Sequence, residues 1–216
     1  LTHFHPDHIG CAAWLQRRGH FETLETVRVL AVEGPAGGVE WMRRDAPGVW
    51  EPVAAHQPLL PGDGLRTGPF NRALLKFSDL GTFWLDKRSQ IHIPPERKPW
   101  RVLELLRGAV FFFHRDREGD LEIRTRLQNA LVRGTEFNVR VADDDTTILT
   151  LLDGEVEMSN EFGRLTLTGG QEGRVEPGKA PAKTTAVLHP LHVIQWCLYY
   201  PGVLDLDELP LPPEAA

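Results

Sequence analysis

Residues 131–175 restrict the possible folds more than any other stretch, because short apolar runs alternate there with turn residues several times. Phe137 and Val139 alternate with polar neighbours, which is the period-two pattern of a half-buried β-strand. Asp153 and Gly154 stand between two apolar runs. This pair predicts a hairpin turn, because a type I′ turn requires positive φ. The stretch therefore indicates closely spaced β-strands.

The same order of strand and turn recurs elsewhere in the chain. Residues 73–93 resemble residues 147–167 in pattern, and residues 103–113 form a third unit of strand, glycine and strand. Such repetition favours a stacked or rolled β architecture, although a plain series of hairpins gives the same pattern. We therefore predict an all-β fold of repeated short strands, preceded by a short N-terminal helix over residues 7–18.

The pattern divides the chain into three parts. Residues 1–26 are predicted to be an N-terminal fragment that contains the histidine-rich motif THFHPDH and a short link to the next part. Residues 27–186 are predicted to form the β domain. Residues 187–216 are predicted to cover the open end of that domain with apolar side chains and to finish in a disordered, proline-rich tail.

Composition limits the class of protein. With 216 residues there is room for one sizeable domain, and a net charge of −6 argues against a nucleic-acid surface. No apolar run approaches the roughly 18 residues of a membrane helix. Cys11 and Cys197 are compatible with one disulfide and equally with two free thiols.

The N-terminal stretch THFHPDH concentrates the metal-binding chemistry. His3, His5, Asp7 and His8 lie within six residues, and imidazole with carboxylate suits Zn²⁺. Four ligands so close together cannot surround one tetrahedral ion without strain. Two ions, each taking one pair, fit the spacing better.

This stretch resembles the H-x-H-x-D-H signature of the metallo-β-lactamase-fold hydrolases. The resemblance implies that His3 and His5 hold one zinc and that Asp7 and His8 hold the second, with a bridging hydroxide as nucleophile. The remaining strands and later metal ligands of that family have no clear counterpart here. The alternative function is accordingly a zinc-dependent hydrolase, and we expect neither catalytic residues nor a cofactor in the β domain.

A second resemblance covers residues 29–183. Five pieces occur in the order found in the FecR-domain family: VEGPAGGVEW, PLLPGDGLRTGPFNRALLKFSD, LELLRGAVFFF, ALVRGTEFNV and TLLDGEVEMSNEFGRLTLTGGQEGRV. The resemblance implies a β-rich extracytoplasmic module, periplasmic or of the cell envelope, of the kind used in membrane signalling. It also implies a protein partner and no catalysis. The favoured prediction is therefore a non-catalytic module for sensing, signalling or protein–protein scaffolding.

Overall fold

The computed structural model describes residues 27–77, 81–95, 101–113 and 121–184, and within these ranges every helix or strand is a β-strand. The prediction of an all-β fold is confirmed. The predicted helix over residues 7–18 and the predicted cover segment from residue 187 lie outside the described residues. The described strands begin at Val27 and end at Lys183, and the three-part division of the chain stays a prediction.

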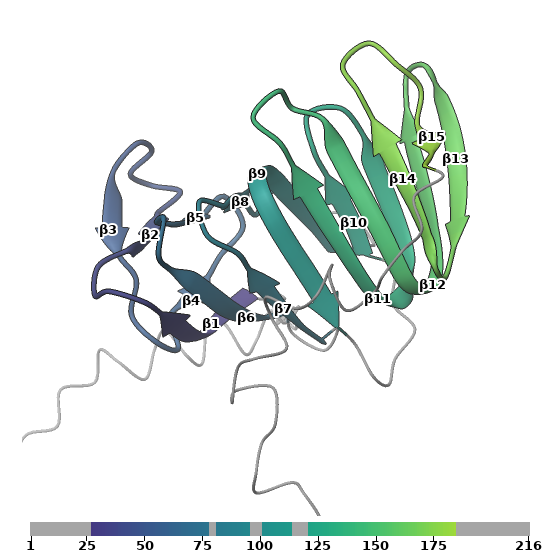
Figure 1. Ribbon diagram of the computed structural model, residues 1–216. Coiled ribbons are helices and arrows are strands. Elements are labelled where there is room, and N and C mark those ends of the chain that lie inside the picture. The colour runs from purple at the N-terminus through teal and green to yellow at the C-terminus, as the bar shows by residue number, and fades with distance from the viewer. Residues whose placement is uncertain (1–26, 78–80, 96–100, 114–120, 185–216) are drawn as a thin grey trace, which may run out of the picture.

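The strands pair in two layers. Layer A contains β4 (Pro58–Leu59), β1 (Val27–Glu33), β6 (Arg72–Phe77), β7 (Gly81–Leu85), β14 (Gln171–Val175) and β15 (Ala182–Lys183). Layer B contains β3 (Trp50–Pro52), β2 (Val39–Met42), β5 (Gly64–Thr67), β8 (Gln90–His92), β10 (Leu121–Arg124) and β13 (Gly163–Thr168). In Figure 1, β2, β3, β5 and β8 lie above β1, β4, β6 and β7.

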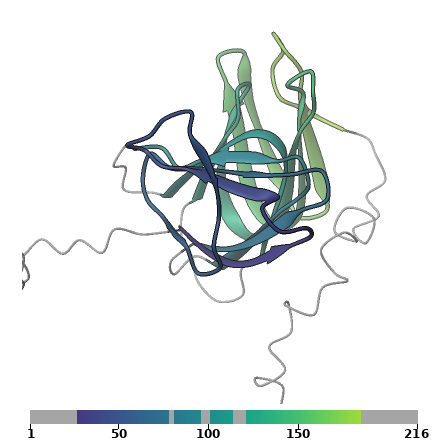
Figure 2. The same ribbon diagram turned by 90° about the vertical axis from the view of Figure 1, so that its left-hand side faces the viewer.

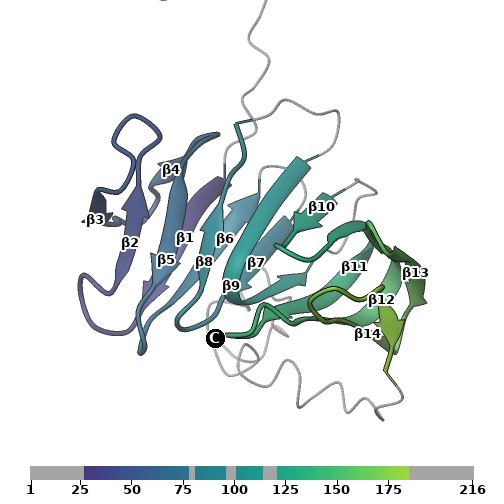
Figure 3. The ribbon, with the colours of Figure 1, turned by 90° about the horizontal axis from the view of Figure 1, so that it is seen from above.

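Three long strands belong to both layers: β9 (Arg101–Phe113), β11 (Asn129–Val141) and β12 (Thr147–Asn160). The first part of β9 pairs with β8 and β10 in layer B, and its second part pairs with β7 and β11 in layer A. In β11 the first half likewise pairs with β10 and the second half with β9. In β12 the first half pairs with β14 and the second half with β13. The result is a barrel-like sheet, with β9 between the two ends of the molecule (Figures 1 and 3).

Seen from the end that carries β1 to β8, the strands surround an interior (Figure 2). The large cluster of buried apolar side chains forms the core of the domain. One row of inward side chains crosses layer A in register, and each is almost fully buried: Leu75, Phe83, Phe112, Phe137 and Leu151. The rings of Phe112 and Phe137 stack with centroids 5.1 Å apart. Burial of such aromatic and aliphatic groups is the main stabilising term of the fold.

Gly108 allows β9 to pass from layer B to layer A. Its φ of 84° lies in the left-handed region, which favours glycine. A Cβ atom at this position would also stand only 2.5 Å from Ser89 Cα. Ser89 is fully buried and its Oγ accepts the N–H of Ala109 at 2.9 Å, so the neighbour cannot withdraw without losing a buried hydrogen bond.

The predicted hairpin turn at Asp153 and Gly154 is wrong. The strand β12 continues through both residues, and Gly154, with φ 100°, marks the point where β12 changes layer. Among the described residues, Gly154 but not Asp153 has positive φ, whereas a type I′ turn needs it at both central positions. The glycine therefore produces a bend rather than a reversal.

We predict that Gly108→Ala destabilises the protein far more than Gly48→Ala. Both glycines have φ 84°, but a Cβ at Gly48 meets no atom within 4 Å. Backbone strain of about 1 kcal/mol is common to both variants, whereas the overlap with Ser89 adds about 1–3 kcal/mol in Gly108→Ala alone. Urea unfolding of the two variants measures the difference, and equal midpoints would show that the contact with Ser89 relaxes freely.

Candidate functional site

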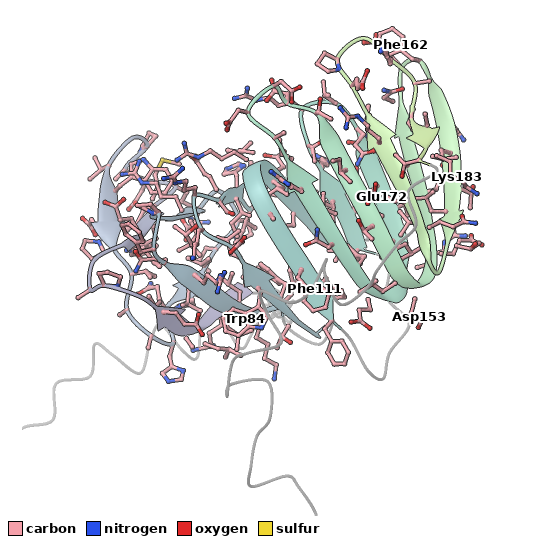
Figure 4. The ribbon with its side chains drawn as sticks, viewed as in Figure 1. Trp84, Phe111, Asp153, Phe162, Glu172 and Lys183 are labelled. Carbon is pink, nitrogen blue, oxygen red and sulfur yellow. The ribbon has the colours of Figure 1, made fainter. Side chains whose placement is uncertain are left out.

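One row of outward side chains crosses layer A and changes character halfway. In register from β6 to β14 it reads Leu74, Trp84, Phe111, Asn138, Thr150 and Glu172. Leu74, Trp84 and Phe111 form a small buried apolar cluster, whereas the residues from β11 onward are polar. Figure 4 shows Trp84 and Phe111 close together and Glu172 farther along the same face.

A cleft of about 870 Å³ opens beside the polar part of this row. Its walls come from β2, the end of β5, the turn between β7 and β8, the bend of β9, the end of β11, and from β12 and β14. The cleft therefore lies where β9 and β11 bring both layers together, and we treat it as the candidate functional site.

The turn between β7 and β8 is anchored by contacts with β5 and β6. Thr67 N–H donates to the Ser89 carbonyl at 2.9 Å, and Ser89 N–H donates to Thr67 Oγ1 at 2.9 Å. Asp86 accepts Arg72 Nε at 2.7 Å. Arg88, within this turn, has a φ of 54°, which is uncommon for a non-glycine residue. This wall of the cleft is therefore held in a fixed conformation.

One buried hydroxyl, one half-buried hydroxyl and one carboxylate form a polar group beside β14. Thr150 Oγ1 donates to Glu172 Oε2 at 2.9 Å, and Thr184 Oγ1 donates to Glu172 Oε1 at 2.9 Å. Both oxygens of the carboxylate thus have a partner within the protein.

Asn138 is different, because its buried Oδ1 has no hydrogen-bond partner. The residue is 8% exposed and lies between Phe111 and Thr150 in register, where it lines the cleft. A buried acceptor without a donor normally costs free energy, so such groups in native proteins call for an explanation.

The lining of the cleft is more basic than the chain as a whole. It contains five Lys or Arg residues and four Asp or Glu residues, against a net charge of −6 for the whole chain. Arg66 pairs with Glu40 at 2.7 Å and its guanidinium lies 4.3 Å from the centroid of the Trp50 ring. In the described part of the chain, four exposed side chains of the lining have no hydrogen-bond or ion-pair partner: Lys87, Arg88, Arg107 and Arg140.

The predicted zinc ligands His3, His5, Asp7 and His8 lie outside the described residues, so the two-metal site stays a prediction. Within residues 27–77, 81–95, 101–113 and 121–184, no group of three or more His, Cys, Asp or Glu side chains could hold a metal ion.

Asp63 and His92, two titratable residues of the β domain, form hydrogen bonds with other residues of the domain. Asp63 accepts the N–H groups of Arg44 and Leu60 at 2.9 and 2.8 Å, and His92 Nδ1 lies 2.8 Å from Glu104 Oε2. Asp63 therefore stabilises the turn that precedes β5.

The family model described as FecR protein matches residues 63–157. The sequence resemblance to FecR over residues 29–183 is thus supported for this central part, which runs from the start of β5 nearly to the end of β12. The match supports a signalling or regulatory module. All residues that line the cleft except Glu40 and Glu172 fall within it.

A search of curated proteins found no significant match. Two crystal structures of a candidate anti-sigma factor from Parabacteroides distasonis, at 1.65 and 2.50 Å resolution, align with TM-scores of 0.49 and identities of 21% and 20%. Each alignment covers 56% of this chain and 58% of the other, so the chain spans less than two thirds of those proteins. No helix in the described ranges is long and apolar enough to cross a membrane.

A carboxylate pair lies on the next outward row of layer A. Glu136 on β11 faces Asp153 on β12 in register. Burial raises the pKa of Glu136, and the negative charge of Asp153 raises it further. An acid with a raised pKa binds its proton more tightly in the folded state, so its ionised form destabilises the fold.

We therefore predict that Glu136→Gln raises the melting temperature at pH 7 to 8. The gain should shrink as the pH falls and should vanish only well below about 4.3, the ordinary pKa of glutamate, where Glu136 is protonated in both the folded and the unfolded chain. Thermal melts of wild type and variant across this range measure the effect. A difference that is independent of pH would show that the charge of Glu136 is not its origin.

Proposed function

We propose that this chain is a non-catalytic extracytoplasmic β module for sensing or signalling, and that it binds another protein through the cleft. The observation that carries the proposal is the coincidence of the FecR match with the cleft lining. The extracytoplasmic location follows from what the resemblance to that family implies.

The residue types around the cleft favour a protein partner. Arginine and aromatic side chains are enriched where proteins bind one another, and they contribute much of the binding energy. The cleft carries four arginines, and Phe70, which follows the lining residue Pro69, is 72% exposed. An exposed aromatic residue that directly follows the lining and the cations of the lining together offer apolar and charged contacts to a partner.

The proposal predicts that a photo-crosslinking amino acid at Arg107 forms a covalent adduct with one protein in the native cells. The same amino acid at Val49, which is 53% exposed but outside the cleft lining, should not form this adduct. Removing the neighbouring charges with Arg88→Gln and Arg140→Gln should weaken it severalfold. Equal adducts from both positions, or none from position 107, would contradict the cleft as the binding surface.

The zinc alternative predicts a different measurement on the full chain. If His3, His5, Asp7 and His8 formed a working hydrolase, the purified protein would hold stoichiometric zinc. His3→Ala and Asp7→Ala would then lose zinc and hydrolytic activity together. We expect well under one tightly bound zinc per chain by elemental analysis. Stoichiometric zinc with activity that these variants abolish would favour the hydrolase over the binding module.

A further inference from the structure

We infer that the cleft recognises an extended acidic peptide segment, with Asn138 pairing to a main-chain amide of that segment. This inference rests on the proposed function, because it specifies the chemistry of the protein partner. Two independent observations in the cleft support it. The side-chain oxygen of Asn138 is buried and has no hydrogen-bond donor, and four basic side chains of the lining have no ion-pair partner among the described residues.

The first observation concerns hydrogen bonding. Asn138 lines the cleft, and its Oδ1 is buried and unpartnered. A rotation of the side-chain amide toward the cleft would let a ligand that carries a donor satisfy this oxygen. Ionised carboxylate and sulfate groups bring acceptors only. A peptide group brings an N–H for Oδ1 and a carbonyl for the side-chain NH₂, and a primary amide pairs with both. Asn138 therefore selects for an amide rather than for a bare anion.

The second observation concerns charge. Lys87, Arg88, Arg107 and Arg140 line the cleft and have no ion-pair partner among the described residues. They come from two walls, the turn between β7 and β8 and the strands β9 and β11. Of the acidic residues in the lining, Glu40 and Asp86 are already paired with arginines, and Glu172 accepts two hydroxyls.

Asp143 remains as an exposed acidic group at the end of the cleft formed by β11. The lining that the structure describes thus has four basic side chains without an ion-pair partner, whereas its remaining acidic groups are the exposed Asp143 and the hydrogen-bonded Glu172. Guanidinium groups bind carboxylates in a planar, paired geometry, so this balance favours Glu or Asp side chains flanking the amide that Asn138 binds.

The test is fluorescence anisotropy with a labelled peptide of alternating Glu and Gly and a matched peptide of Gln and Gly. We expect the acidic peptide to bind at least tenfold more tightly. Its affinity should fall as salt rises from about 50 to about 500 mM, because exposed charges are screened.

Variants of the full chain separate the two observations. Arg107→Gln with Arg140→Gln should weaken the acidic peptide about tenfold. The matched control, Lys76→Gln with Arg164→Gln, removes two exposed cations outside the cleft lining and should change the affinity less than twofold. Asn138→Leu should weaken the acidic and the neutral peptide by the same factor without lowering the melting temperature, because it removes an unpartnered polar group.

The outcomes distinguish this inference from the function it rests on. If neither peptide binds, or if the two arginine substitutions have no effect on the affinity, the inference that the cleft recognises an acidic peptide is wrong. A crosslinked adduct at position 107 would still support the proposal that the cleft binds a protein. An oligogalacturonate that binds as tightly as the acidic peptide and is equally sensitive to Asn138→Leu would assign the cleft to acidic saccharides instead. If Asn138→Leu fails to fold, the arginine variants alone decide.

Discussion

The close packing of Gly108 against Ser89 is the contact on which the rest of this structure depends. At that point β9 leaves layer B and enters layer A, and no side chain fits between the strand and the buried serine. Ser89, in the turn before β8, also exchanges two hydrogen bonds with Thr67 on β5 and accepts one from Ala109 on β9. Ser89 therefore connects this turn to both strands. Thr67, Gly108 and Ala109 all line the cleft. The residues that let β9 pass between the layers therefore also form a wall of the candidate site.

The outward face of layer A combines two environments along one row of residues. Leu74, Trp84 and Phe111 pack together on β6, β7 and β9, and Asn138 and Thr150 replace apolar side chains on β11 and β12. Thr150 satisfies its hydroxyl with Glu172, but Asn138 Oδ1 has no such partner. A protein tolerates the cost of a buried unpaired acceptor where a ligand completes it, which agrees with the position of Asn138 at the cleft.

The sequence was sufficient for the fold class but not for the path of the strands. The alternation around Phe137 and Val139 correctly predicts a strand with these residues inside, because side-chain direction follows a period of two. The pair Asp153 and Gly154 has the composition of a hairpin turn, yet β12 bends there instead. The local sequence indicates that a glycine will have positive φ. Whether the strand then bends or turns back on itself depends on the strands with which it pairs.

The candidate site could not be predicted from local pattern for a related reason. Asn138 occupies an outward position of a half-buried strand, where a polar residue is ordinary, and its burial arises from neighbours on other strands. Arg107 and Arg140 belong to different strands and meet at the cleft only because β9 and β11 pair in layer A. Sharing β9, β11 and β12 between the layers also has a kinetic consequence. Each of these strands stays held by one layer when the other opens, so the main-chain amides in the paired segments on either side of the bends should exchange slowly with solvent and should report global unfolding.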